Sequence, residues 1–208
     1  MRNPVKERVS LVTKHDFDSL PTCSEIEVRP ARHSELAGVA DMGRRLVPGV
    51  QISEPTLGEY LTFDPECILT FGRQEKLLGA MAFLYLNSRG HDALMLGEIS
   101  LAQPDVGLLA GRNAAVSAIY IRAIAATGRS IAGLGKAAAH LRAPRYVDAD
   151  CFAQPSSRAG RDLLMATGFR QTPSFQPDLW CYQRPWKRLP ANMPVSNVSA
   201  RSFADARH

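Results

Sequence analysis

The amino-acid sequence predicts a mixed α/β fold organised around a central sheet, and three observations lead to this prediction. Strand-like and helix-like patterns alternate along the 208 residues, in the order strand, two helices, hairpin, strand, helix, strand, helix, strand. The second hairpin strand is apolar on both faces, so it belongs inside a sheet that is covered on both sides. Between Ser117 and Leu141, an apolar run ends at Thr127-Gly128 and a glycine-spaced helix start follows, which outlines a strand, a tight loop and a helix.

The first third of the chain is predicted to form one strand and two helices. Alternation of apolar and polar residues predicts a strand at Glu25–Ala31. Ser34 can cap a helix with one apolar face, which Pro48-Gly49 ends. Ser53 and Pro55 are typical of the start of a second, shorter helix.

A hairpin and an ambiguous segment follow. Cys67–Arg73 and Lys76–Asn87 read as two strands joined by a short polar turn. Residues 88–113 contain one apolar patch, ALMLGEISLA, between turn-rich stretches, and we interpret this patch as a further strand.

The second half of the chain is predicted to alternate strands with helices. Ile119–Ala125 could be helical from its alanine content, but Ile-Tyr-Ile favours a strand. Four more elements follow: a helix from Ser130 to Pro144, a strand at Tyr146–Ala153, a helix from Pro155 to Gly168, and a strand at Leu179–Arg184.

Composition bounds the domain organisation and the location. We expect a polar N-terminal arm (1–24), a single domain (25–184) and a basic, disordered tail (185–208). From Arg184 onward, five basic residues face one acidic residue; we interpret the tail as solvated and do not expect a nucleic-acid partner. The longest apolar run, LLGAMAFLYL, is too short to cross a bilayer, and no apolar signal segment follows the basic N-terminus. We therefore expect a cytoplasmic protein with no membrane partner.

Neither disulfides nor metals are expected. The four cysteines, Cys23, Cys67, Cys151 and Cys181, lie far apart and form no C-x-x-C pair, which favours buried reduced thiols. His33 and His91 have no histidine at i+4, so the spacing indicates no metal site.

The junction after the Ile119–Ala125 strand carries the functional prediction. A strand, loop and helix start aim several main-chain N–H groups and the positive end of a helix dipole at one point. The N–H groups between Thr127 and Lys136 are therefore predicted to form a cradle for a diphosphate.

The order of elements resembles that of the GNAT acyltransferases, which move acyl groups from coenzyme A to amines. The resemblance covers residues 25–184. Ser130–Gly135 falls on the family's coenzyme A loop pattern, Q/R-x-x-G-x-G/A, with Ser130 where Gln or Arg is usual and Arg129 one residue earlier. Leu163–Thr172, LLMATGFRQT, looks like the family's helix-end GF signature.

This resemblance implies a mixed, mostly antiparallel central sheet with helices on both faces, and acetyl-CoA or another acyl-CoA as cofactor. The acceptor would be a primary amine of a small molecule or peptide, in a pocket formed by residues 88–113 and the two early helices. Dimers are common in the family, which allows a homodimer. The implied cofactor-binding residues are Ile124, Ala125, Arg129, Ser130, Ile131, Ala132, Gly133, Leu134 and Gly135.

Candidates for proton transfer follow from the same chemistry. We predict Glu98 as the general base, because an apolar context would raise its carboxyl pKa; a solvent-facing strand residue is the competing interpretation. The family's thiolate-protonating tyrosine is here Leu164, which cannot donate, so Ser156, Ser157 and Tyr120 are the candidate donors.

Arg122 interrupts the apolar strand that precedes the loop. It could bind a carboxylate of the substrate, or it could point to solvent with its stem packed.

The expected function is therefore that of an N-acyltransferase, in particular an N-acetyltransferase, in which the amine attacks the thioester directly. The missing tyrosine leaves open a degenerate module of the same fold that binds acyl-CoA or docks a partner without turnover. A Rossmann-type nucleotide-binding protein ranks last, because Ala138 stands at the third glycine position of G-x-G-x-x-G.

Overall fold

The computed structural model of the protein describes residues 16–23, 25–49, 52–126 and 128–184. Most of the predicted arm (1–15) and the whole basic tail (185–208) lie outside the described residues. The described strands form one seven-stranded sheet in the order β1-β2-β3-β4-β5-β7-β6. Among them only β4 and β5 pair in parallel. The predicted mixed α/β fold with a mostly antiparallel central sheet is confirmed.

The strands are β1 (Glu27–Pro30), β2 (Ile68–Arg73), β3 (Lys76–Leu86), β4 (Ala118–Ala126), β5 (Asp150–Ala153), β6 (Arg170–Gln171) and β7 (Trp180–Tyr182). The helices are α1 (Leu36–Leu46), α2 (Glu54–Phe63), α3 (Ser88–Leu96), α4 (Gly133–His140) and α5 (Arg158–Ala166). Short 3-10 helices add η1 (Phe17–Ser19), η2 (His33–Glu35), η3 (Val106–Leu108) and η4 (Gly128–Ala132). None of the helices in the described ranges is long and apolar enough to cross a membrane.

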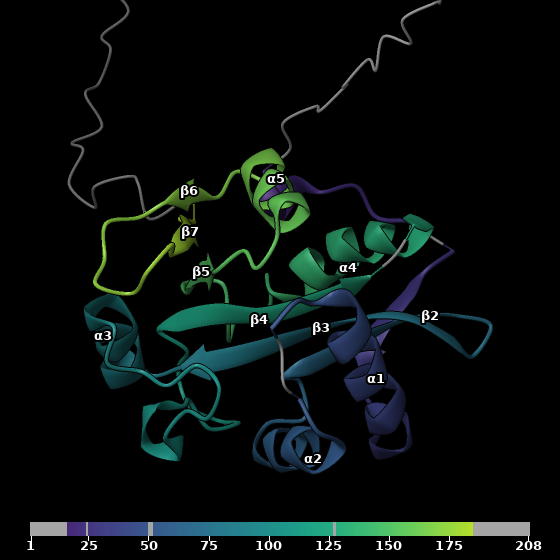
Figure 1. Ribbon diagram of the computed structural model, residues 1–208, viewed down its shortest axis with the longest axis horizontal. Coiled ribbons are helices and arrows are strands. Elements are labelled where there is room, and N and C mark those ends of the chain that lie inside the picture. The colour runs from purple at the N-terminus through teal and green to yellow at the C-terminus, as the bar shows by residue number, and fades with distance from the viewer. Residues whose placement is uncertain (1–15, 24, 50–51, 127, 185–208) are drawn as a thin grey trace, which may run out of the picture.

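Helices cover both faces of the sheet. In Figure 1, α1 and α2 lie below the sheet, and α4 and α5 lie above it. The long strand β3 is central and largely buried along its length, as its two apolar faces predict. On the α4 side, the ring of Phe71 in β2 lies where a Cβ on Gly79 or Gly133 would be, at 2.9 Å and 2.8 Å from its nearest ring atoms. Both glycines therefore make room for one aromatic side chain.

The caps of α2 and α5 follow the sequence signals, whereas the predicted Ser34 cap is wrong: Ser34 lies within η2, and the N-cap of α1, Glu35, makes no side-chain cap hydrogen bond. Ser53 caps α2, because its Oγ accepts a hydrogen bond from the Thr56 N–H at 3.3 Å. Ser157 does the same for α5, accepting from the Gly160 N–H at 3.1 Å. Gly168 has a φ of +87° just after α5, a left-handed conformation that glycine adopts at little cost.

The predicted strand within residues 88–113 is wrong, because this segment begins with helix α3. Asn87 caps α3 by accepting from the Gly90 N–H at 2.9 Å, and Gly97 ends it with a φ of +71°. The apolar patch suggested a strand, yet the flanking cap and left-handed glycine fix a helical turn. One apolar side chain, Leu94, supplies most of the buried face of α3.

The predicted strand Tyr146–Ala153 begins four residues late, at Asp150. The preceding residues form turns, in which the Tyr146 ring is buried and stacks on Tyr85 at a centroid distance of 4.8 Å. The short strand β6 (Arg170–Gln171) pairs with β7 and was not predicted individually.

Part of the expected N-terminal arm belongs to the domain. Phe17 is buried and its ring packs against Phe169 and Tyr182, at centroid distances of 5.5 Å and 5.7 Å. Asp18 forms an ion pair with the fully buried Arg184 at the far end of the chain. The domain therefore includes residues 16–23, which the expected boundary at residue 25 excludes.

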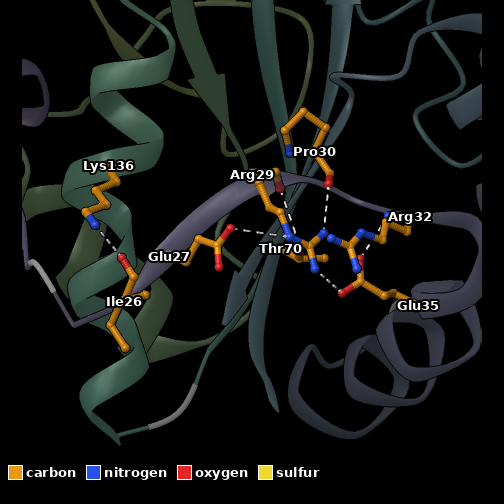
Figure 2. A network of polar contacts seen from close by, with 8 residues as sticks. All are labelled: Ile26, Glu27, Arg29, Pro30, Arg32, Glu35, Thr70 and Lys136. Atoms are coloured by element: carbon orange, nitrogen blue, oxygen red, sulfur yellow. Dashed lines mark hydrogen bonds and ion pairs between the residues drawn. The ribbon is translucent and has the colours of Figure 1, made fainter. Parts of the chain in front are cut away.

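A polar network joins β1 to its neighbours (Figure 2). The Arg29 guanidinium donates to both carboxylate oxygens of Glu35, at 2.8 Å and 2.7 Å. The hydrogen bonds from Arg29 lower the pKa of the Glu35 carboxyl. On the other side of β1, the Lys136 ammonium of α4 donates to the Ile26 carbonyl at 2.6 Å. These contacts fix the sheet edge against α1 and α4.

Candidate functional site

A cleft opens where the two parallel strands of the sheet separate. The β4–β5 pairing ends at Ile121 and Ala153, but β4 continues to Ala126. The cleft has a volume of about 760 Å³. Its walls come from the last residues of β4, the end of α1 and the residues after it (46–49), the first turns of α5, and the loop before β7 (177–178). Parallel strands that separate leave the edge of β4 without a β5 partner, so its amide groups can pair with an extended ligand.

A β-bulge in β4, at the place where the cleft begins, changes the direction in which the following side chains point. The pairing of β3 with β4 is regular up to Phe83 and Ile121, then resumes at Ala82 and Ala123, which leaves Arg122 as the extra residue. A bulge reverses the faces to which the following side chains point and commonly lies beside functional sites. Ile124 lines the cleft, whereas the Ala125 side chain is buried in a cluster with Met42 of α1 and Val47, the residue after α1.

The end of β4 leads into the beginning of a helical run. The 3-10 helix η4 starts at Gly128, whose φ is +55°, and continues into α4. The first N–H groups of such a run have no acceptor within the helix, and they carry the positive end of the dipole. Ala126 before this start and Ile131 after it both line the cleft. The predicted strand, turn and helix start are therefore present, although Thr127 itself lies outside the described residues.

Gly133, Leu134 and Gly135 lie in the first turn of α4. All three are buried within α4 and do not form an open loop. A Cβ on Gly135 would lie 2.1 Å from the carbonyl oxygen of Pro21. The two glycines therefore permit close packing onto Phe71 and onto the N-terminal segment. The prediction that they bind cofactor stays a prediction.

The remaining loop residues divide between the cleft and the interior. Ile131 is 40% exposed and lines the cleft, whereas Ser130 is 4% exposed. Ala132 is half-buried at the end of η4, and the Arg129 side chain lies outside the described residues. The helix start, at the N-terminal end of the predicted cradle, is therefore formed by η4 (Gly128–Ala132).

Tyr120 is the candidate proton donor that the structure brings into the cleft. Its hydroxyl donates to Gln154 Oε1 at 3.0 Å, and Gln154 Nε2 donates to the Pro177 carbonyl. Burial raises the pKa of the Tyr120 phenol to about 12, and the nearby Arg122 cation partly opposes this rise. Tyr120 is therefore neutral and able to donate over the physiological pH range.

The other predicted donors are also near the cleft. Ser156 and Ser157 both line it. The Ser157 hydroxyl oxygen accepts the cap hydrogen bond of α5, a contact that does not use its O–H hydrogen. Leu164, at the position of the family's tyrosine, also lines the cleft and is buried. A hydrocarbon side chain there can shape the acyl site but cannot protonate a thiolate.

Arg122 is held at the cleft in a fixed position. Its Nη2 donates to the Ala102 carbonyl at 2.7 Å, and its Cζ lies 5.0 Å from the centroid of the Tyr60 ring. Tyr60 donates to the same carbonyl at 3.4 Å. A stacked guanidinium of this kind gains a cation–π contribution and loses rotamer freedom.

The carboxylate predicted as the base does not lie in the cleft. Glu98 follows the C-terminal glycine of α3, is exposed, and is not among the cleft residues. In the described part of the chain, the carboxylate that lines the cleft is Asp178. Its oxygens accept from Arg161 Nη2 at 2.8 Å and from Trp180 Nε1 at 3.0 Å. Both contacts engage this carboxylate within the protein.

Several cleft residues were not predicted from sequence. They come from residues 154–155 after β5, from α5 and from the loop before β7. The first of the two early helices, which were expected in the acceptor pocket, reaches the cleft with its last residue, Leu46. Residues 88–113, expected in the acceptor pocket, do not line the cleft, although Ala102 holds Arg122. Pro48-Gly49 and Pro177-Asp178 are turn signals that mark loops; the sequence alone does not show that these two loops meet.

The cysteines are free thiols, three of them buried, as predicted. Burial raises the pKa of Cys67 to about 12, so this thiol is not a nucleophile near neutral pH. Within the described ranges no three His, Cys, Asp or Glu residues are grouped so that they could hold a metal ion.

No family model and no curated protein matches the chain. Among solved structures it resembles Ard1 from Thermoplasma volcanium, at 12% identity and a TM-score of 0.48, and Arabidopsis thaliana Naa50 in complex with the bisubstrate analogue CoA-Ac-MVNAL, at 13% and 0.46. Each match covers 76% of this chain and 95% of the other.

A third match is the GphF GNAT-like decarboxylase in complex with isobutyryl-CoA, at 17% identity and a TM-score of 0.43. The match covers 61% of this chain and 64% of the decarboxylase. At TM-scores of 0.43 to 0.48, these matches show nothing about the function. The function is therefore argued from the chain's own residues.

Proposed function

We propose that the protein is an N-acyltransferase that binds acyl-CoA in the β4–β5 cleft and transfers the acyl group to a primary amine. The observation that carries this proposal is the edge of β4 beyond Ile121, which lacks a β5 partner and leads directly into the start of a helical run at Gly128. An extended ligand with amide groups can pair with such an edge. A diphosphate is stabilised by the N–H groups and the dipole at the helix start.

The proposed reaction is a direct attack of the amine on the thioester, with Tyr120 beside the departing sulfur. The amine nitrogen forms a bond to the thioester carbon, the carbon–sulfur bond breaks, and the departing thiolate accepts a hydrogen bond from the Tyr120 hydroxyl. The amine releases its surplus proton to solvent, and the thiolate leaves as the anion or takes a proton from solvent. Gln154 acts as a positioning residue, because it accepts from Tyr120 before the reaction and is itself anchored to the Pro177 carbonyl. Since a tyrosine hydroxyl has one hydrogen, this O–H must turn from Gln154 to the sulfur as the thiolate departs.

The donor strength suits this role. A thiol has an unperturbed pKa of about 8.5, whereas burial raises the pKa of Tyr120 to about 12. Complete proton transfer to a thiolate is therefore uphill, and the main contribution of Tyr120 is a hydrogen bond to the departing sulfur. This bond strengthens as negative charge develops, which is the condition for transition-state stabilisation.

No base in the cleft is assigned, since the Asp178 carboxylate is engaged by Arg161 and Trp180. The amine must then arrive unprotonated. We expect kcat/KM to rise with pH until the acceptor amine itself is deprotonated, and this rise to shift when an acceptor of different amine pKa is used. A rise that stays at one pH for every acceptor would instead identify a protein base, and replacing Glu98 with Gln would test the sequence-based candidate.

The acyl group is proposed to be acetyl or another short chain. Apolar side chains from three elements, Leu46, Ile124 and Leu164, line the cleft. Such a lining favours a small hydrocarbon group over a charged one. A series of acyl-CoAs of increasing chain length, compared by kcat/KM, tests this part of the proposal.

Binding is tested first, by thermal unfolding and calorimetry with coenzyme A and acetyl-CoA. Ligand at ~100 times its Kd contributes about 2.7 kcal/mol of stability. Ala159→Trp fills the cleft from an exposed position on α5 and should abolish the effect. The matched control, Ala37→Trp, adds the same side chain at an exposed position on α1 away from the cleft and should retain it.

Turnover is tested next, by thiol release from acetyl-CoA with a panel of amines. Release that depends on both protein and amine supports an enzyme. Binding without release for every amine would support the degenerate module instead. No stabilisation by any acyl-CoA, or equal stabilisation of both tryptophan variants, would overturn the proposed site.

A further inference from the structure

Arg122 lines the cleft, and in the described part of the chain its guanidinium forms no ion pair with a carboxylate. Among these residues its hydrogen bond goes to a neutral carbonyl, that of Ala102, and its guanidinium stacks on Tyr60. The one lining carboxylate, Asp178, is paired with Arg161. A guanidinium has five N–H donors, and a single one is used here, so donors remain for a ligand.

The position of Arg122 separates it from the proposed diphosphate site. Arg122 is the bulged residue at the beginning of the open edge, and Ala126 ends β4 four residues later. A strand rises ~3.3 Å per residue, so Arg122 lies about 13 Å before the end of β4. The helix start that would hold the diphosphate lies beyond that end. The Arg122 backbone is therefore at the end of the open edge opposite the diphosphate, which is where the proposed function places the thioester.

The residues around Arg122 support the same placement. Tyr120, the proposed donor to the departing sulfur, lies two residues away on β4 and also lines the cleft. The Arg122 charge opposes the rise in the pKa of Tyr120 that burial causes, so the two groups are close enough to interact electrostatically. The residues after α1 (47–49) line the cleft as well, so the proposed acceptor would contact them beside Arg122.

From this geometry we infer that Arg122 selects the acceptor: the protein acylates primary amines that also carry a carboxylate, with Arg122 binding that carboxylate. The inference rests on the proposed acyltransfer. An arginine fork binds a carboxylate through two parallel N–H···O bonds, and this would orient the amine toward the thioester. Fixed orientation of two reactants is a large part of what a two-substrate site contributes to rate.

The experiment compares amino acids with their primary amides as acceptors, at equal concentrations of unprotonated amine and saturating acetyl-CoA. The wild-type chain should prefer the carboxylate by at least ~10-fold in kcat/KM, the lower end expected for hydrogen bonds to a charged group. Arg122→Gln should reduce this preference to about 1, and Arg122→Lys should keep only part of it, because lysine lacks the planar fork. The control Arg89→Gln removes the same charge from an exposed position on α3 and should keep the full preference.

Two further readouts separate this inference from the proposed function. The stabilisation by coenzyme A should be the same in Arg122→Gln as in the wild type; a stability loss in Arg122→Gln with the preference retained would show a structural role and overturn the inference. Equal turnover of amino acids and amides by the wild type would also overturn it while leaving the acyltransferase in place. If no amine is turned over, calorimetric titration of the same pairs onto coenzyme A-saturated protein decides. Binding that requires both the carboxylate and Arg122 supports the inference, and any other pattern contradicts it.

Discussion

Replacing Tyr120 with Phe removes one oxygen atom from the cleft and tests the proposed donor. In the folded protein this oxygen donates to Gln154 Oε1 at 3.0 Å. Gln176 Nε2 lies 3.5 Å from the same acceptor, so Gln154 keeps a partner in the variant. The stability cost should therefore be small, about 1 kcal/mol.

The effect on rate should be larger than the effect on stability. A hydrogen bond to a charged group contributes about 1.5–3 kcal/mol, and each 1.36 kcal/mol in the barrier is tenfold in rate. Loss of the bond to the departing thiolate should therefore lower kcat by about 10- to 150-fold. The Kd for acetyl-CoA should change little, because the bond strengthens only as the sulfur becomes negative.

The assay is thiol release under saturating acceptor, with the Kd measured separately by calorimetry. Tyr85→Phe is the matched control: its hydroxyl is also buried and donates to the Glu66 carbonyl at 2.9 Å, but it does not line the cleft. The control should lose stability without losing kcat. A Tyr120→Phe variant with kcat within twofold of the wild type would refute the reasoning, as would equal kcat losses in the two variants.

Three further predictions concern packing and charge. Gly135→Ala should destabilise the protein by about 1–3 kcal/mol in urea unfolding, since the added Cβ would lie 2.1 Å from a backbone oxygen. Gly43→Ala in α1 should stabilise it by about 0.5–1 kcal/mol, because a Cβ there meets no atom within 4 Å. A change of the same sign in both variants would contradict the packing account. Glu35→Gln should lower the free energy of unfolding by about 1 kcal/mol near pH 7. Because Arg29 lowers the pKa of Glu35 from 4.5, the stabilisation by this ion pair is present above pH 4.5 and is lost as the pH falls through the lowered pKa. The unfolding curves of wild type and variant should therefore converge in acid, and a constant difference between them would count against the ion pair. Arg184→Met should leave Asp18 without its partner and cost about 3–5 kcal/mol, measured by urea unfolding; a loss below 1 kcal/mol would show that the pair does not anchor the N-terminal segment.

Local signals predicted most of the elements because each depends on neighbouring residues. Ser53 and Ser157 cap helices through N–H groups three residues ahead, and the fully apolar β3 is central because both its faces are covered. The preference for a strand at Ile119–Ala125 over a helix is confirmed. The hydrophobic pattern did not predict helix α3 within residues 88–113, because Leu94 is its one buried apolar side chain. The sequence signal for this helix is its Asn87 cap.

The cleft was less predictable than the fold, because it is made by long-range geometry. The bulge at Arg122 depends on the register of β3 against β4, and the sequence of neither strand alone determines that register. The spacing of Gly133 and Gly135 suggested an open loop; their actual neighbours are Phe71 and Pro21, which are distant in sequence. Glycine spacing alone does not show whether the backbone lies close to a ligand or packs against another segment of the same protein.

The most direct measurement of the central claim is residue-resolved amide hydrogen exchange, with and without coenzyme A. If the open edge of β4 and the following helix start form the binding site, coenzyme A should slow exchange of amides in residues 122–126 and 128–131, and it should leave the amides of the α3 segment unchanged. Protection confined to other elements, or no protection at saturating coenzyme A, would contradict the account.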